Sequence, residues 1–211
     1  MHVKSIISAL ALLIATGVSA QTKTTLPTHY QEFVPSVITF ADGHSSSQQF
    51  TNVFLKNSTL LFLSGATAME ANMDNIVKVA FADRTYINIK GQLAYFVDSV
   101  RNNSLYCVEL FDQESYERNI RNNVNYANIT LGGDALSTTT VDLNNEGDYM
   151  MPVIPVYYYI YNGKTIRVHE RDIWHEMPKA KRRIYKTIIG ENDFSWVEPE
   201  SLMKLLKAIS D

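Results

Sequence analysis

Residues Asn75–Asp98, NIVKVAFADRTYINIKGQLAYFVD, contain three short segments with alternating side-chain character, separated by two turn-forming pairs. Alternation with a period of two between turn residues is typical of antiparallel strands joined as hairpins. Lys90-Gly91 is the stronger turn, because glycine adopts the positive φ that a two-residue hairpin loop requires. Asp83-Arg84 has no such glycine, so a longer loop is an alternative there. Three strands with one apolar face are about the minimum for an independently stable sheet.

Apolar segments recur about every ten residues along most of the chain, which is typical of an antiparallel barrel, roll or sandwich. Asn162-Gly163 predicts a further tight hairpin. Pro152 and Pro155 cannot donate to a sheet ladder, so their segment is predicted at an edge or before the paired part. The other predicted strands are Val37–Phe40, Gln48–Leu55, Thr59–Leu63, Ala66–Glu70, Ser104–Phe111, Val124–Leu131, Leu136–Leu143, Val156–Tyr161 and Lys164–His169.

After His169 the pattern changes to that of helices. Pro178 suits a first helical position and Gly190 a helix end. At about 100° per residue, a buried stripe is predicted from Met177, Ala180, Ile184 and Ile188. The final helix is predicted to begin at Pro199, with Leu202, Leu205, Leu206 and Ile209 on its apolar face. These helices must bury their apolar stripes, most simply on the sheet.

We therefore predict an α+β fold, in which an antiparallel β-meander forms a partly open barrel or roll with a C-terminal tail of two to three helices. Residues 21–211 are predicted to be one mature domain, mainly β over 21–169 and helical over 170–211. Gln113–Asn122 is predicted to be a further short helix. Residues 21–34 are predicted to be a polar lead-in that is poorly ordered at its start.

Residues 1–20 have the three parts of a secretory signal peptide. A short basic segment ends at Lys4, the apolar stretch Ile6–Val18 follows, and small side chains end the segment at Ala20. This stretch is too short to span a bilayer, and no later one is long enough. We predict an exported protein, periplasmic or extracellular, with no transmembrane segment. Because residues 1–30 contain no cysteine, it is not predicted to be a lipoprotein.

The composition is that of an ordinary globular protein, with 45% hydrophobic and 19% charged residues and a formal net charge of −3. Cys107 is the single cysteine, so no intramolecular disulfide can form, and its apolar neighbours predict a buried thiol. An exported domain without a disulfide suits a bacterial periplasm or cell surface.

Two stretches carry a resemblance to known proteins. The segment YNGKTIRVHERDIWHEMPKAKRRIYKTIIGENDFSWVEPESLMKLLKAI, residues 161–209, resembles the C-terminal pattern of uncharacterised exported proteins from Bacteroidetes-type bacteria. VAFADRTYINIKGQLAYFV, residues 79–97, is similar to the β-rich part of such proteins. The resemblance covers about half of the mature chain. It implies an exported bacterial origin and brings no catalytic or binding residue with it.

Catalytic and metal motifs have little support. His169-Glu170 and His175-Glu176 are spaced by six residues, whereas a zinc-protease helix needs two histidines four apart on one face. The chain has no Gly-x-Ser-x-Gly, P-loop or Gly-x-Gly-x-x-Gly motif, so neither a metal nor a cofactor is predicted. A carboxylate pair for glycoside cleavage remains an alternative. Its candidates are Asp98, Glu109, Asp112 and Glu114.

Two groups of residues are candidates for binding. Tyr157, Tyr159 and Tyr161 share one strand face and, with Trp174, are candidates for stacking on a sugar or a partner, with packing in the core as the alternative. Lys179, Arg182, Arg183 and Lys186 form a basic helix face. This face is either solvated or docks to an anionic envelope polymer or protein partner. Nucleic acid is not predicted, because the protein is exported and acidic and no aromatic residues alternate with these cations.

The favoured functional hypothesis is an exported, non-catalytic binding or envelope-associated protein that holds a glycan, peptide or protein partner. A small exported hydrolase using carboxylate or histidine chemistry is one alternative, and a structural accessory subunit of an envelope complex is another. The sequence does not predict an oligomeric state.

Overall fold

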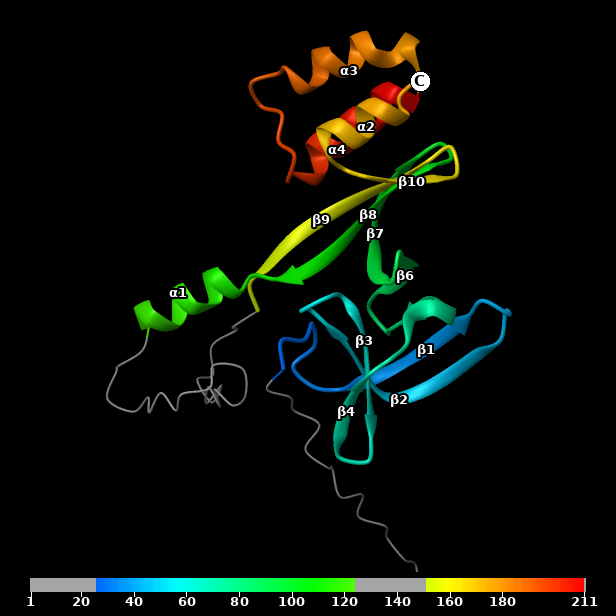
Figure 1. Ribbon diagram of the computed structural model, residues 1–211, viewed down its shortest axis with the longest axis vertical. Helices are drawn as coiled ribbons and strands as arrows, with labels where there is room; N and C mark the ends of the chain where they lie inside the picture. Colours follow the sequence, from blue (N-terminus) through cyan, green and yellow to red (C-terminus); the bar gives the residue numbers. More distant parts are fainter. Residues whose placement is uncertain (1–25, 124–150, 211) are drawn as a thin grey trace, which may run out of the picture.

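The structure is a computed structural model that describes residues 26–123 and 151–210. The predicted signal peptide and the predicted strands Val124–Leu131 and Leu136–Leu143 lie outside the described residues. Figure 1 shows an elongated molecule with the C-terminal helices gathered at one end and the N-terminal strands at the other.

Ten strands form one antiparallel sheet in the order β10-β9-β8-β7-β6-β5-β1-β2-β3-β4. Two runs of sequential neighbours, β1 to β4 and β5 to β10, are joined where β1 pairs with β5. The strands are β1 (Val34–Phe40), β2 (Ser45–Phe54), β3 (Thr59–Ser64), β4 (Thr67–Glu70), β5 (Ile76–Ala80), β6 (Thr85–Ile89), β7 (Gln92–Val100), β8 (Asn103–Phe111), β9 (Val153–Tyr161) and β10 (Lys164–Arg167). The predicted α+β class and antiparallel meander are confirmed.

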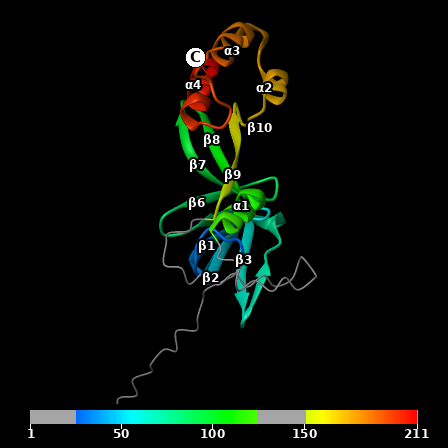
Figure 2. The ribbon, with the colours of Figure 1, turned by 90° about the vertical axis from the view of Figure 1, so that its left-hand side faces the viewer.

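The helices of the C-terminal region lie over one end of this sheet in both views (Figures 1 and 2). The helical elements are η1 (Met73–Asn75), α1 (Gln113–Asn123), α2 (Glu170–Glu176), η3 (Lys179–Lys181), α3 (Arg182–Ile189) and α4 (Pro199–Ser210). Residues 170–210 are called the helical cap below. Within the described ranges, no helix is both long and apolar enough to cross a membrane.

The tight hairpins form where the sequence predicts them. Lys90 and Gly91 have φ values of 54° and 84°, and Asn162 and Gly163 have 50° and 76°. Positive φ at both central residues is the geometry whose twist matches that of the flanking strands. The β5–β6 connection is the longer loop anticipated for Asp83-Arg84, and the Phe81 N–H closes it by donating to the Arg84 carbonyl at 2.9 Å.

Three hydrogen bonds curl the sheet into a half-barrel by bringing the β2–β3 turn against β7 and β8. The Leu93 N–H donates to the Ser58 carbonyl at 2.6 Å, and the Ser58 hydroxyl donates to the Leu93 carbonyl at 2.8 Å. The Phe111 N–H donates to the Leu55 carbonyl at 2.7 Å. The backbone N–H groups of Leu93 and Phe111 thus find carbonyl partners in the β2–β3 turn region, on the other side of the curled sheet.

The segment that precedes β1 is tied to the sheet over its described part, and the start of the predicted lead-in lies outside the described residues. Thr28 forms a bridge with Phe54, and the side chain of Asn52 bonds both the N–H and the carbonyl of Tyr30. Asn52 is fully buried. Its side-chain amide pairs with backbone groups of this short segment that no neighbouring strand pairs with.

The buried apolar residues of the described chain form three clusters, and the smallest contains Ile89, Ala94, Val108 and Tyr158. Of the two larger clusters, one lies inside the half-barrel and contains Leu60, Val79 and Leu93. The other lies between β7–β10 and the helical cap and is centred on α4. Tyr95 packs against both of the larger clusters. The predicted apolar face of α4 is confirmed, since Leu202, Leu205, Leu206 and Ile209 are all buried.

The stripe predicted for the preceding helix is correct only in part, because Met177 is buried and Ile188 packs against the core. Ala180 is exposed and Ile184 is 39% exposed, whereas Tyr185 is the buried residue of α3. Residues 179–181 form the separate 3-10 turn η3, and α3 begins only at Arg182. A 3-10 helix turns by about 120° per residue and an α-helix by about 100°. The directions of the side chains therefore shift where η3 meets α3, so one apolar stripe does not run through both elements.

Candidate functional site

The predicted tyrosine platform lies in the core of the protein. Tyr157, Tyr159 and Tyr161 face the helical cap and are 7%, 0% and 8% exposed. The Tyr159 hydroxyl donates to the Leu202 carbonyl at 2.6 Å, and the Tyr161 hydroxyl donates to the Ile209 carbonyl at 3.1 Å. These rings attach α4 to the sheet, the packing role considered as the alternative, and they present no surface to a ligand.

Trp174, the fourth residue of that candidate set, is instead joined to the basic residues. The Arg182 guanidinium carbon lies 4.5 Å from the centroid of the Trp174 ring, and the Lys186 ammonium nitrogen lies 5.2 Å from it. Tyr185 packs against the same indole with ring centroids 5.7 Å apart. Cations within about 6 Å of an indole centroid are attracted by the quadrupole of the ring. Two separately predicted sets therefore meet at one place.

The cations of η3 and α3 form what we call the basic face. It comprises Lys179, Lys181, Arg182, Arg183 and Lys186. None of these five side chains has a carboxylate partner in the part of the chain that the structure describes, although two other lysines near the cap do. Lys164 pairs with Glu176 at 2.8 Å, and Lys204 pairs with Glu191. The basic face is therefore electrostatically unbalanced within the described protein.

The N-terminus of α3 adds to this imbalance. Its first turn contains no acidic residue, and Lys181 at the N-cap makes no side-chain capping bond. Helix N-termini favour negative charge because of the macrodipole and the free N–H groups. Arg182 and Arg183 place positive charge at this end of α3, which is the unfavourable sign.

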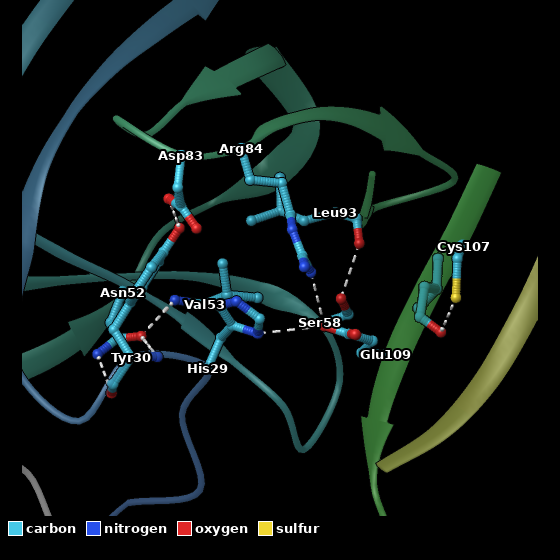
Figure 3. A network of polar contacts seen from close by, with 11 residues as sticks. His29, Tyr30, Asn52, Val53, Ser58, Asp83, Arg84, Leu93, Cys107 and Glu109 are labelled. Carbon is cyan, nitrogen blue, oxygen red and sulfur yellow. Dashed lines mark hydrogen bonds and ion pairs between the residues drawn. The ribbon is translucent and has the colours of Figure 1, made fainter. Parts of the chain in front are cut away.

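A second polar cluster consists of His29, Tyr30, Asp83, Arg84 and Glu109, and we call it the mouth cluster. It lies where the N-terminal segment, the β5–β6 loop and β8 meet (Figure 3). The Glu109 carboxylate lies 3.1 Å from the His29 Nδ1 atom and 3.4 Å from the Arg84 Nη1 atom. The Tyr30 hydroxyl donates to Asp83 at 2.6 Å. The side chains of His29 and Glu109 are only 16% and 17% exposed, so this cluster is held largely out of water.

The environment of the mouth cluster shifts several pKa values. Burial acts to raise the pKa of Asp83, but the hydrogen bond from Tyr30 and the nearby charges of His29 and Arg84 outweigh it, so the pKa lies below its ordinary value. Burial raises the pKa of the Cys107 thiol to about 11. A thiol that stays protonated at neutral pH is a poor nucleophile.

The four predicted carboxylate candidates lie in different surroundings. Glu109 belongs to the mouth cluster, while Asp112 accepts the Ser115 N–H at 3.0 Å at the start of α1. Asp98 and Glu114 are exposed. Glu109 contacts His29 and Arg84, and Asp112 contacts the helix that it caps.

Two hollows were found in the described protein. One lies between Tyr161, Ile173 and Met177 and has a volume of about 10 Å³, room for a single water molecule. The other is an open groove of about 360 Å³ beside a β-bulge of β1, lined by Pro35, Gln48, Gln49 and other uncharged residues. Over residues 26–123 and 151–210, no three His, Cys, Asp or Glu side chains are grouped to hold a metal.

Sequence reasoning missed the mouth cluster. His29 precedes the first strand and Glu109 lies near the end of β8, so no local spacing connects them. The longer Asp83-Arg84 loop was the one available signal, because it places an acidic and a basic residue next to each other in a turn. Comparison of the chain with models of protein families, with curated protein sequences and with solved structures finds no match.

Proposed function

We propose that this chain is an exported, non-catalytic binding protein that docks to an anionic polymer of the cell envelope through the basic face. The observation that carries this proposal is the set of five cations in η3 and α3 without carboxylate partners among the described residues. A solvated face needs no such concentration of one charge sign over residues 179–186. The whole chain has a formal net charge of −3, so this positive charge is local.

The position of α3 makes the basic face accessible to a large partner. Both ribbon views place α3 farthest from strands β1–β4, at the outer end of the helical cap (Figures 1 and 2). Lys179, Arg183 and Lys186 are exposed. A polymer can therefore contact these cations without approaching the half-barrel. Attraction between exposed charges acts over about 10 Å at 0.1 M salt, and it weakens as salt increases.

The mouth cluster gives the hydrolase alternative one feature, a histidine paired with a carboxylate, as in catalytic triads. Such chemistry also needs a nucleophile activated by that histidine. In the described residues, no serine, threonine or cysteine side chain is hydrogen-bonded to His29, and Cys107 has a raised pKa. The basic face is therefore the better-supported site of function.

The proposal is tested by retention of the purified protein on immobilised dextran sulfate, with neutral dextran as the reference matrix. We expect retention on dextran sulfate alone at about 0.05 M salt and loss of retention toward about 0.5 M, where screening is strong. Replacing all five cations of the basic face by Gln should abolish retention.

A matched variant tests whether position matters beyond net charge. It carries five Gln substitutions at exposed cations elsewhere, namely Lys56, Lys78, Lys90, Arg167 and Lys207. This variant should keep most of the retention of the unmodified protein. Equal loss in both variants, or no retention of the unmodified protein at low salt, would overturn the proposal.

A further inference from the structure

We infer that Arg182 and Lys186, held over Trp174, form a preorganised site for a phosphate monoester group. The inference rests on the proposed function, because it names the group that the basic face recognises on its anionic partner. It assigns a defined binding site to three residues rather than a diffuse attraction to the whole face.

The first argument is the convergence of two like charges on one ring. The Arg182 guanidinium and the Lys186 ammonium lie 4.5 Å and 5.2 Å from the centroid of the same indole. Each cation gains from the ring, but the two repel each other, and neither has a carboxylate partner among the described residues. A bound anion between them would remove this repulsion.

The second argument is an unsatisfied donor. The Nε–H group of Arg182 is buried and has no hydrogen-bond acceptor within the described residues. Buried donors in native proteins are nearly always paired, and an exception requires an explanation such as an ion. The guanidinium of Arg182 is thus held over the indole, and one of its donors has no acceptor among the described residues.

The third argument is the helix end at which Arg182 lies. Arg182 is the first residue of the eight-residue helix α3, whose first turn has no acidic residue and whose N-cap makes no side-chain bond. An anion near this end would be stabilised by the helix macrodipole. It would also offset the positive charge that Arg182 places at this end.

The number of charges and donors favours a phosphate monoester. Two cations present two positive charges, and a phosphate monoester carries close to two negative charges near neutral pH with three acceptor oxygens. The planar fork of arginine binds two such oxygens at once, and lysine contributes a point charge. A carboxylate offers one charge and two oxygens, so it matches the site less well.

Intrinsic fluorescence reports directly on this site. The chain contains two tryptophans, and both lie in the helical cap. In the Trp196→Phe protein, Trp174 is the single emitter beneath the two cations. Inorganic phosphate, sulfate and acetate are titrated at constant ionic strength. We expect a saturable fluorescence change with phosphate, a weaker one with sulfate and none with acetate.

Neighbouring arginines supply the matched variants. Arg182→Gln and Arg183→Gln remove the same charge from adjacent positions, but only Arg182 lies over the indole. We expect Arg182→Gln and Lys186→Gln each to weaken phosphate binding about tenfold or more, as loss of one charge-assisted hydrogen bond implies. Arg183→Gln should weaken it less than about threefold. Arg182→Lys keeps the charge without the fork and should give an intermediate loss, while far-UV circular dichroism confirms folding.

Two further arms identify the source of the phosphate, a soluble sugar phosphate and vesicles containing phosphatidic acid in phosphatidylcholine. Binding of either one supports the site and names its source. Retention on dextran sulfate without a saturable phosphate response overturns this inference and leaves the proposed function intact. Equal effects of Arg182→Gln and Arg183→Gln overturn it as well. Failure of both phosphate binding and polymer retention overturns both proposals.

Discussion

The imidazole of His29 meets the carboxylate of Glu109 at 3.1 Å and thereby fastens the segment before the first strand to β8. Arg84 approaches the same carboxylate oxygen from the β5–β6 loop at 3.4 Å. One acidic side chain therefore connects three parts of the half-barrel that are distant in sequence. The strength of this connection is a property of the fold that can be measured separately from binding.

Glu109→Gln should destabilise the protein by about 1–3 kcal/mol, the usual cost of losing a hydrogen bond to a charged group. The amide keeps the shape of the side chain but leaves Arg84 without a counter-charge and His29 without its carboxylate partner. Unfolding in urea, followed by circular dichroism, measures this loss. Glu176→Gln is the matched control, since its partner Lys164 is 70% exposed and exposed pairs contribute about 0–1 kcal/mol. Equal losses in the two variants would contradict a special role for Glu109.

Tyr159→Phe should cost about 0.5–1.5 kcal/mol, because it deletes the hydrogen bond to the Leu202 carbonyl and keeps the ring. Tyr159→Ala should cost about 3–5 kcal/mol, since the removed ring is fully buried beneath α4. The free energy of unfolding in urea distinguishes the two effects. Tyr106→Phe serves as control, because Tyr106 is half-buried, and no loss above about 0.5 kcal/mol is expected. A Tyr159→Phe protein as stable as the unmodified one would show that the hydroxyl does not hold α4.

Local sequence signals predicted the local parts of this fold. Lys90-Gly91 and Asn162-Gly163 form hairpins because their positive φ values are set by residues within the turn. The buried face of α4 follows from the spacing of Leu202 to Ile209 along one helix. In these cases the residues that determine the local structure lie within a few positions of it. A single sequence is therefore sufficient to predict that structure.

Contacts between distant segments were beyond the sequence. The pairing of β1 with β5 and the meeting of His29 with Glu109 depend on how the sheet curls, which no short pattern encodes. The shared face of Tyr157, Tyr159 and Tyr161 was predictable from alternation. Packing of the C-terminal helices on the sheet was also predicted, but the face that α4 covers was not, because it depends on the path of the chain after Gly190.

The thiol of Cys107 should be inert in the folded protein. It is 1% exposed, and burial raises its pKa to about 11. Its reaction with a disulfide reagent near pH 8 should be slower than that of a free thiol by at least about 100-fold, because both access and the thiolate fraction are reduced. In urea the labelling rate should increase together with the unfolded fraction. A Cys107→Ala protein with Ser47→Cys, at an exposed position of β2, provides the reactive reference. Rapid labelling of native Cys107 would contradict its burial.

Alkaline pH should unfold this protein through its buried acids. Burial raises the pKa of Cys107 from 9.0 to about 11, and it raises the pKa of Tyr157 and of Tyr185 from 10.0 to about 12. Because the folded state holds these protons more tightly than the unfolded state does, their contribution to stability is complete below the unfolded pKa values. That contribution is lost as pH increases through the folded values.

The free energy of unfolding should therefore be insensitive to these groups up to about pH 9 and should decrease between about pH 9 and 12. Urea unfolding at a series of pH values measures the decrease, and phenolate absorbance should increase cooperatively with loss of circular dichroism. Cys107→Ala should remove the part of the decrease that begins near pH 9 and keep the part above pH 10. Independent, non-cooperative ionisation of the tyrosines near pH 10, with stability unchanged, would show that the rings beneath the helical cap are accessible to water.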